Sequence, residues 1–286
     1  MTPRKAQFEA ARKDFKSPDF SLYRHIGHDA LLHKLSVDGW CQLPSMTLDE
    51  TAVAQVVWGA SQAQLYNAHV KAQSNGLPRS FADLKSFAAH ACLDTSDTLR
   101  IKPLFDLCLE PVILSLASSY FSGALPICYS MNAWWSFPQN GAPTTTQGFH
   151  RDHDTYRFLS CFVFLSPTGG SRGGEHLFVR HSHDEDMVER HVPHLAWLNR
   201  MTQEQARANE VAMSPDVISG QPGEIFLADT WGWHKAALPR ADRLVAWFRY
   251  AINKPDSFTW DKLDEVRKLN PEGMNEVQRH VLQFFI

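Results

Sequence analysis

The sequence predicts a mainly β protein of the sandwich or barrel type, such as a jelly roll, with helices on its flanks. From residue 126 onward, short runs rich in aromatic and β-branched residues alternate with Gly, Pro, Asp and Ser, as strands alternate with turns. The run at 157–165 is apolar on both faces, which is expected of an inner strand covered by helices on one side. The five predicted strands span residues 127–137, 157–165, 174–180, 223–229 and 243–252.

Helical patterns dominate the chain before and after this region. Residues 32–44 predict the end of a helix, a turn at Asp38-Gly39 and a short strand. Thr47 and Glu50 have the spacing of a capping box and should open a long helix. Pro111 should break or restart the helix that contains it. The other predicted helices span residues 4–15, 81–90, 103–121, 261–270 and 275–286.

The sequence shows no internal repeat, low-complexity segment or linker, so we predict a single domain over residues 1–286. Its parts are a mostly helical segment (1–125), a jelly-roll core (126–255) and C-terminal helices (256–286). One long interruption of the core, residues 184–220, contains two helix-like stretches. This segment is too long for a simple turn, and we expect it to form a lid or a substrate-binding insertion.

Charge and composition argue against several kinds of partner. The 28 Lys and Arg residues nearly balance the 31 Asp and Glu residues, and the net charge of -3 argues against nucleic-acid binding. Nine Trp and eighteen Phe residues argue against disorder. No apolar run reaches the length of a membrane span. We therefore expect small molecules as partners, and the oligomeric state is left open.

The cysteines and the N-terminus bear on the cellular compartment. Five cysteines, an odd number without a C-x-x-C pair, argue against a disulfide framework or a zinc knuckle and favour reduced, buried thiols. The N-terminus lacks the apolar segment of a signal peptide. We therefore expect a cytoplasmic protein.

The motif that carries chemistry begins with His150-Arg151-Asp152. Fourteen His and nineteen Asp residues in 286 predict about one H-x-D by chance, so the motif alone is weak. Its position gives it weight, because it begins a predicted strand, and side chains at i and i+2 of a strand point to the same side. An imidazole and a carboxylate on one face are two of the three ligands of a 2-His-1-carboxylate facial triad, which binds a metal ion.

The third ligand, a second histidine, must come from a distant segment. His234 is the natural candidate, because it lies between the predicted strands at 223–229 and 243–252. Arg243 then opens the last of these strands. The planar fork of a guanidinium pairs bidentately with a carboxylate, so Arg243 is suited to hold the far end of a dicarboxylate cosubstrate. Arg240 is the alternative, but it lies in the turn before the strand.

Taken together, these residues give the sequence a resemblance to the phytanoyl-CoA dioxygenase-like family of Fe(II)/2-oxoglutarate-dependent oxygenases. Residues 149–166 resemble the family's aromatic residue, H-x-D and apolar strand, and residues 223–250 resemble its distal His and Arg segment. Residues 173–183 are similar to a family stretch that ends in Gly-Ser-His, and residues 38–44 resemble its entry strand. The sequence departs from the family at Arg180-His181, where Pro-Gly is common.

The resemblance implies a double-stranded β-helix (jelly-roll, cupin-like) core and a dioxygenase activity. His150, Asp152 and His234 would ligate Fe(II), and Arg243 would bind the distal carboxylate of 2-oxoglutarate. Asn132, on the strand before the H-x-D, would contact the same cosubstrate. Three protein ligands leave three positions on an octahedral iron for 2-oxoglutarate and dioxygen, with ascorbate as an auxiliary reductant. Asp152 favours hydroxylation, because halogenating relatives replace this carboxylate by a small residue.

Other functions and products stay open at the level of the sequence. A catalytically silent cupin-like protein could keep a metal for structure, and a zinc hydrolase could use the same three ligands. Within the oxygenase interpretation, desaturation and cyclisation are alternatives to hydroxylation. No long apolar groove is evident in the sequence, so we favour a small polar substrate, with a sugar as one example.

The remaining histidines and tryptophans near these segments are expected to be structural. His153, on the opposite strand face from the motif, should support the site at most indirectly. The H-x-H at 181–183 should lie in a strand-end turn rather than bind a metal. For the Trp pairs 134–135 and 231–233 we expect core packing, with an aromatic substrate pocket as the alternative.

Overall fold

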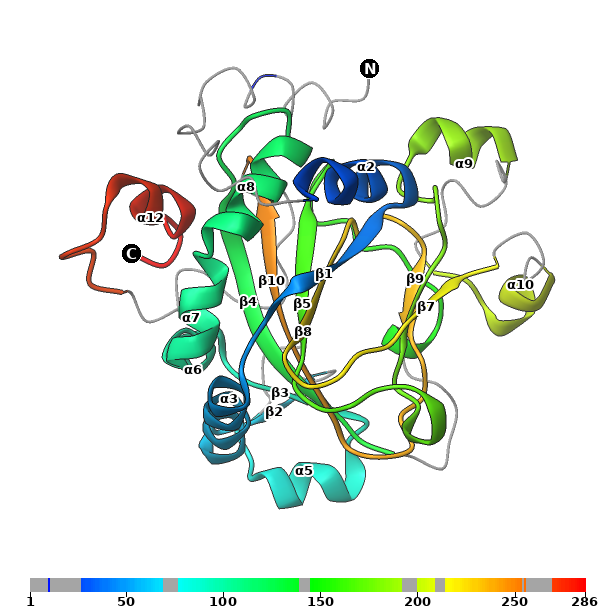
Figure 1. Cartoon of the computed structure of the whole chain (residues 1–286). Coiled ribbons are helices and arrows are strands. Elements are labelled where there is room, and N and C mark those ends of the chain that lie inside the picture. The colour runs from blue at the N-terminus through cyan, green and yellow to red at the C-terminus, as the bar shows by residue number, and fades with distance from the viewer. Residues whose placement is uncertain are drawn as a thin grey trace.

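Two antiparallel β-sheets form the centre of the computed structural model, which describes residues 27–68, 77–138, 145–191, 200–208, 214–253 and 269–286, with residues 10 and 255 (Figure 1). The larger sheet has seven strands in the order β1-β8-β5-β10-β4-β3-β2, and the smaller has three in the order β7-β6-β9. Together with the flanking helices they give the jelly-roll, mainly β architecture that the sequence predicts, so the predicted fold class is confirmed.

The strands of the larger sheet are long at its centre and short at one edge. Its members are β1 (Trp40–Thr47), β2 (Tyr66–Asn67), β3 (His90–Cys92), β4 (Ile127–Ser136), β5 (Leu159–Phe164), β8 (Glu224–Ala228) and β10 (Arg243–Ala251). The smaller sheet consists of β6 (His176–Phe178), β7 (Asp216–Ile218) and β9 (His234–Ala236). All five predicted strands are present, and the short strand predicted within 32–44 is β1.

Two features of the strands differ from the prediction. The segment that begins at His150 was expected to be a strand from its first residue, but the regular strand starts only at Leu159. All six residues of 150–155 are polar, so they lack the apolar side chains of a core strand. The backbone of His150 pairs with His234 of β9, and the N–H of Asp152 donates to the carbonyl of Thr230 in the loop before it. Strands β2, β3, β7 and β9 were not expected, because strands of two or three residues with polar members leave no hydrophobic alternation in the sequence.

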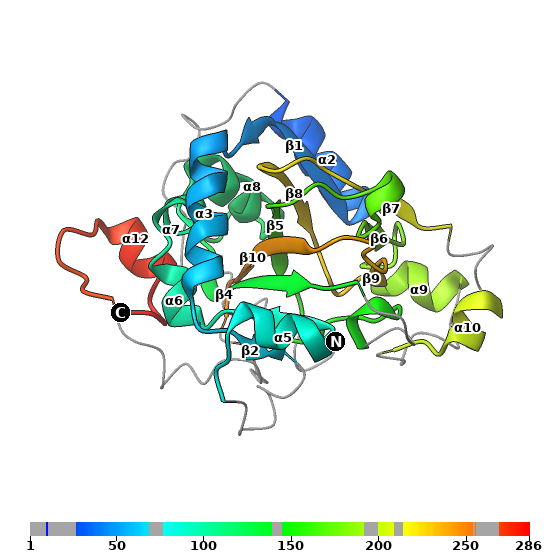
Figure 2. The same ribbon diagram turned by 90° about the horizontal axis from the view of Figure 1, so that it is seen from below.

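The helices pack mainly on the face of the larger sheet that is turned away from the smaller sheet. Helices α3, α6, α7, α8 and α12 lie together on this side in both views (Figures 1 and 2). No helix among the described residues combines the length and the apolar character needed to cross a bilayer. The helix bounds are α2 (His28–Asp38), α3 (Glu50–Gln62), α5 (Phe81–Phe87), α6 (Thr95–Leu99), α7 (Lys102–Cys108), α8 (Pro111–Tyr120), α9 (Glu185–His191), α10 (Gln203–Ala208) and α12 (Glu276–Val281).

Several helix boundaries refine the sequence prediction. The predicted break at Pro111 is confirmed, because α8 begins at this residue after α7 has ended at Cys108. The predicted capping box at Thr47 is wrong: Asp49 caps α3, and its side chain accepts a hydrogen bond from the backbone N–H of Ala52. The predicted helix at 81–90 ends earlier, and its last residue belongs to β3. The helices predicted at 4–15 and 261–270 lie outside the described residues, apart from residue 10, which is helical, and residues 269 and 270, which are not.

The two faces of strand β10 point to different parts of the molecule, one to the hydrophobic core and the other to a pocket. On one face, Leu244, Ala246, Phe248 and Tyr250 are fully buried in the core between the sheet and the helices. On the other face, Arg243, Val245, Trp247 and Arg249 line a pocket between the two sheets. This alternation follows from the two-residue period of a strand, and it places every second side chain of β10 at the candidate site. The buried cysteines of the chain form no disulfide.

A polar contact joins the edges of the two sheets. The carboxylate of Asp216 on β7 accepts hydrogen bonds from Trp40 Nε1 on β1 at 2.7 Å and from Arg180 Nε and Nη2 at 2.6 and 2.7 Å. Burial raises the pKa of this carboxyl, but the hydrogen bonds from Arg180 and Trp40 outweigh that effect, and the pKa is lowered overall. A lowered pKa means that the contact stabilises the fold only while Asp216 is ionised.

We predict that Asp216→Asn lowers the free energy of unfolding at pH 7 by about 1 kcal/mol, the upper range for an exposed ion pair. The loss should shrink as the pH falls through and below the ordinary pKa of 3.8, because the wild-type carboxylate then becomes protonated as well. Urea denaturation at pH 7 and pH 3 checks this. A loss that is the same at both pH values would show that the charge of Asp216 does not stabilise the fold.

Candidate functional site

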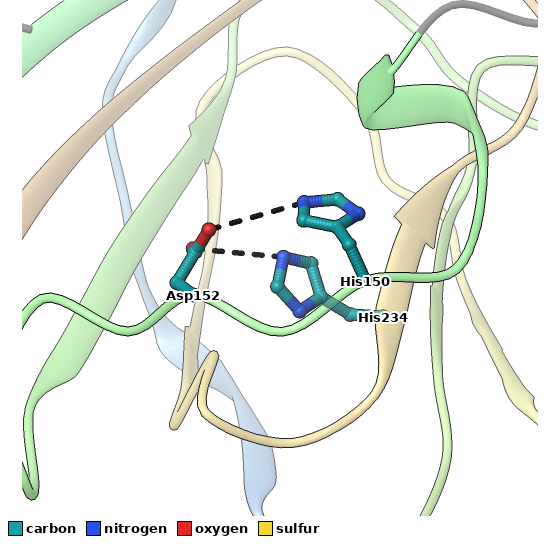
Figure 3. A group of neighbouring side chains, drawn as sticks. All are labelled: His150, Asp152 and His234. Carbon is teal, nitrogen blue, oxygen red and sulfur yellow. Dashed lines mark ion pairs between the residues drawn. The ribbon is translucent and has the colours of Figure 1, made fainter. Parts of the chain in front are cut away.

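A pair of backbone hydrogen bonds brings the first and last residues of the predicted triad together. The N–H of His150 donates to the carbonyl of His234, and the N–H of His234 donates to the carbonyl of His150, each at 3.0 Å. A third bond, from the N–H of Asp152 to the carbonyl of Thr230 at 2.9 Å, holds the next part of the motif against the loop before β9. The three side chains therefore converge on one point (Figure 3).

Both imidazoles are held in a single tautomer. Nδ1 of His150 lies 2.9 Å from the carbonyl oxygen of Gly148, and Nδ1 of His234 lies 2.9 Å from that of Gly232. A carbonyl oxygen can only accept, so in each ring Nδ1 is the donor and carries the hydrogen. When the rings are neutral, both Nε2 atoms carry a free lone pair directed at the centre of the group. This is the usual arrangement of metal-binding histidines.

The carboxylate of Asp152 completes the group. Its Oδ1 lies 3.9 Å from Nε2 of His150, and its Oδ2 lies 3.7 Å from Nε2 of His234. One ligand atom from each residue lies within 4.8 Å of the others. These separations are too long for direct hydrogen bonds, but they fit an ion in the middle that is bound at about 2.0–2.2 Å. Two imidazole nitrogens and one carboxylate are also the donor set of a facial triad.

Protonation states at neutral pH suit metal binding. Burial, followed by the charge of His234, lowers the pKa of His150 to about 3, and burial also lowers the pKa of His234. Burial raises the pKa of Asp152, but Arg249 and the two histidines outweigh it, and the pKa lies well below its usual range. Two neutral imidazoles and one carboxylate are the forms that coordinate a metal ion.

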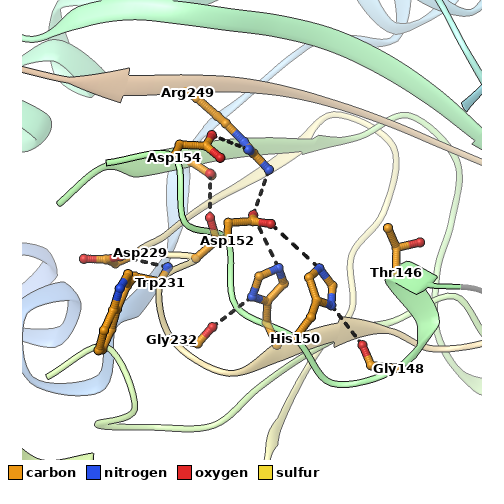
Figure 4. Close-up of polar contacts among 12 residues, drawn as sticks. Thr146, Gly148, His150, Asp152, Asp154, Asp229, Trp231, Gly232 and Arg249 are labelled. Carbon is orange, nitrogen blue, oxygen red and sulfur yellow. Dashed lines mark hydrogen bonds and ion pairs between the residues drawn. The ribbon is translucent and has the colours of Figure 1, made fainter. Parts of the chain in front are cut away.

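Arg249 is a member of the site that was not predicted from the sequence. Its Nη2 donates to Oδ2 of Asp152 at 2.7 Å, and its Nη1 pairs with Asp154 (Figure 4). Burial disfavours the charged guanidinium, but the two carboxylates outweigh that effect and raise the pKa of Arg249. The guanidinium therefore fixes the position of the carboxylate that faces the two histidines. The available signal was its spacing of six from Arg243, which places both arginines on the same face of β10.

Arg243 lies at the other end of the same face of β10 and lines the same pocket. The residue is 8% exposed, and Nε is buried with no hydrogen-bond partner in the part of the chain that the structure describes. Burial lowers its pKa to about 10, which leaves it charged at neutral pH. A Cβ on Gly174, whose φ is +75°, would lie 2.7 Å from Cδ of Arg243, so this glycine leaves the space that the arginine occupies.

Asn132 faces this pocket from β4, as the sequence predicts. It is 4% exposed, its Oδ1 has no hydrogen-bond partner within the described ranges, and its strand neighbours Ser130 and Trp134 lie on the same face. The pocket encloses about 1080 Å³ when its open mouth is counted, which is room for more than one small ligand. Arg240, the alternative to Arg243, is exposed and does not line the pocket.

The other histidines near the motif lie in structural contacts. His153 packs edge-on against Trp231 at 6.3 Å between ring centroids and does not line the pocket. His181 and His183 bond to the backbone carbonyls of Val37 and Ser36, so the H-x-H holds α2. Within the described residues, the one group of three or more ligands that could share an ion is His150, Asp152 and His234.

The tryptophan pairs divide between core and pocket. Trp134 lines the pocket and meets Trp247 of β10 in a T-shaped contact at 5.0 Å, whereas Trp135 packs against Phe81 on the other face of the sheet. Trp231 and Trp233 are not among the residues that line the pocket, and both rings lie near the guanidinium of Arg151. Trp134 and Trp247 therefore form an aromatic wall of the pocket. Only the first of these two residues belongs to a predicted tryptophan pair.

Comparison with known proteins identifies the fold. No family model matches the chain, and no curated protein matches it. Among solved structures, the non-heme alpha ketoglutarate dependent epimerase SnoN from nogalamycin biosynthesis matches with a TM-score of 0.53 and 17% identity, over 79% of this chain and 83% of SnoN. HygX from Streptomyces hygroscopicus, solved with nickel, 2-oxoglutarate and hygromycin B, matches with a TM-score of 0.51 and 13% identity, over 80% and 88% of the two chains.

A third match is an oxidoreductase of the 2OG-Fe(II) oxygenase family from Burkholderia pseudomallei, with a TM-score of 0.50 and 12% identity over 80% of this chain and 92% of its own. At such identities the likeness establishes the fold alone. The chain has the double-stranded β-helix architecture that these oxygenases share. The phytanoyl-CoA dioxygenase-like branch remains a prediction from the sequence.

We predict that Arg249→Met weakens the binding of a divalent metal about 10- to 100-fold, as expected when a metal ligand loses the group that orients it. Titration with Co(II) or Zn(II) measures this, and circular dichroism checks that the variant is folded. The double variant Asp154→Asn/Arg249→Met removes one charge of each sign and should show the same loss without a net change in buried charge. Arg240→Met, on the surface, is the matched control, and equal affinity in all four proteins would contradict the assignment.

Proposed function

We propose that this protein is a non-haem Fe(II)/2-oxoglutarate-dependent dioxygenase that hydroxylates an unactivated C–H bond of a small polar molecule. The metal would be held by Nε2 of His150, Nε2 of His234 and the carboxylate of Asp152. Iron bound there, together with 2-oxoglutarate and dioxygen, supplies the oxidising power for C–H oxidation, with release of succinate and CO2. The protein orients the reactants and excludes water around them.

The observation that carries this proposal is the position of Arg243. The Nε of the buried Arg243 guanidinium has no hydrogen-bond partner among the described residues, and such a group is costly unless a ligand satisfies it. It lines the same pocket as the His–Asp–His group, and a carboxylate is the ligand that fits its fork. A dicarboxylate that chelates the metal at one end would satisfy Arg243 at the other. Asn132 would contact the same molecule from β4.

The substrate side of the pocket supports a small polar molecule. Its walls combine the Trp134–Trp247 pair with polar groups that include His90, Ser130 and Thr146. Aromatic faces and hydrogen-bonding groups together are suited to a polar ring such as a sugar. The presence of Asp152 favours hydroxylation, because a carboxylate occupies the position that a halide would need.

The test is the conversion of 2-oxoglutarate to succinate by the protein reconstituted with Fe(II) in air, with ascorbate as reductant and with or without a panel of polar substrates. Even without the true substrate, slow uncoupled turnover is expected. Two results would overturn the proposal. Tight metal binding without any turnover would indicate a silent metal-binding protein. Hydrolytic activity with Zn(II), in a protein that does not bind 2-oxoglutarate, would indicate a zinc hydrolase.

We predict that Asp152→Ala abolishes succinate formation while the protein remains folded, because it removes one of three metal ligands. Metal titration should show a parallel loss of affinity, and thermal unfolding should show no large loss of stability. As a matched control, Asp186→Ala changes a carboxylate in α9 that is absent from the His–Asp–His group and should leave turnover unchanged. Full turnover in Asp152→Ala would remove this residue from the metal site.

We predict that Arg243→Ala raises the KM for 2-oxoglutarate about 10- to 100-fold, the value of a hydrogen-bonded pair that involves charged groups. The KM for the primary substrate should change far less, because the arginine is assigned to the cosubstrate. Arg240→Ala, three residues away and exposed, is the control and should behave like the wild type. An equal rise in both KM values, or no rise, would show that Arg243 does not bind the cosubstrate.

A further inference from the structure

His176 lies on the middle strand of the smaller sheet, and its ring stacks on that of His234. On β6 it pairs with Ala236 of β9, and the neighbouring register pair on the same face joins Phe178 to His234. The side chain is 5% exposed and lines the pocket. No motif in the sequence points to His176, because the pairing of β6 with β9 is not visible in the sequence.

Three aromatic rings fix the orientation of the His176 imidazole. It stacks on the ring of His234 with an interplanar angle of 10° and a centroid distance of 5.3 Å. Phe162 and Phe226 pack against it at centroid distances of 5.1 and 5.2 Å. Because its neighbours hold the ring in this orientation, its nitrogen atoms have fixed positions, and their hydrogen-bonding surroundings can be assigned.

Nε2 of His176 is buried and has no hydrogen-bond partner within the described residues. A buried polar atom without a partner is uncommon and costs stability, so its persistence points to a ligand. The residue is not a member of the group that could share a metal ion. It nevertheless lies near the positive charge of Arg243, which after burial and His234 is the next largest cause of its lowered pKa. The nearby positive charge of Arg243 favours an anion as this ligand.

We propose that His176 is a cosubstrate-binding residue, whose Nε2–H donates a hydrogen bond to an oxygen of the 2-oxo dicarboxylate held between the metal and Arg243. This inference rests on the proposed function and adds a residue to it. His176 would set the position of the cosubstrate along the pocket, while Arg243 holds its far carboxylate. The Nε2 atom and the Arg243 Nε would then be satisfied by the same bound molecule.

The experiment is calorimetric titration of 2-oxoglutarate into the Zn(II)-loaded protein, which reports binding without turnover. His176→Phe keeps the ring packing but removes the donor, and it should weaken 2-oxoglutarate binding about 10- to 100-fold. His176→Gln returns an N–H donor to a similar position and should lie within a few-fold of the wild type. Zn(II) affinity, measured separately, should be the same in all three proteins. His28→Phe, a buried histidine on α2 outside the pocket, is the matched control and should bind 2-oxoglutarate normally.

The outcomes separate this inference from the proposed function. Normal 2-oxoglutarate binding by His176→Phe, with binding also present in the wild type, would overturn the role of His176 alone. A loss of Zn(II) affinity equal to the loss of 2-oxoglutarate affinity would also overturn it, because it would show that His176 only supports His234. Absence of binding in the metal-loaded wild type would overturn both. If His176→Phe does not fold, His176→Leu and His176→Gln provide the same comparison.

Discussion

The candidate site depends on the two reciprocal backbone hydrogen bonds between His150 and His234. They join the segment that leads into β5 of the larger sheet to the first residue of β9 in the smaller sheet. From β9 the ladder continues to β6, so the same pairing also fixes His176. The positions of the two histidines are therefore inherited from the backbone of two sheets, whereas the carboxylate of Asp152 is also held by the side chain of Arg249.

The carbonyls of Gly148 and Gly232 extend this backbone control to the imidazole rings. Each carbonyl lies two residues before the histidine that it orients, so each ring is held by its own segment. A short, local hydrogen bond of this kind loses little entropy on folding. The two segments thus supply the ligands already oriented, and the contact between the sheets only has to bring them together.

The parts of this protein that the sequence predicts are those with a local signal. Strands β4, β5, β8 and β10 are recognisable because their apolar and β-branched runs are bounded by turn residues. His150, Asp152, His234 and Arg243 were predicted because their order relative to these strands follows a known arrangement. The structure brings the first three together and places Arg243 in their pocket.

The parts that the sequence does not predict depend on long-range pairing. Arg249 contributes to the site because it forms an ion pair with Asp152, a residue 97 positions away. The sequence around either residue does not predict this pair. Strand β9 is three residues long and begins with a polar residue, so only its partner β6 defines it as a strand. The irregular path of the segment before β5 has the same origin, because His150 pairs with His234 and Asp152 bonds to Thr230, both far away in the sequence.

The ion pair between Arg249 and Asp152 also has an electronic consequence. A carboxylate that shares its negative charge with a guanidinium is a weaker donor to a metal ion than one that is free. With two neutral imidazoles as the other donors, a divalent ion bound here would retain much of its positive charge. Such a centre would attract anions to its open coordination positions, and for a redox-active metal it would favour the reduced oxidation state. If a metal ion binds here as proposed, the arginine would tune the reactivity of the centre as well as its shape.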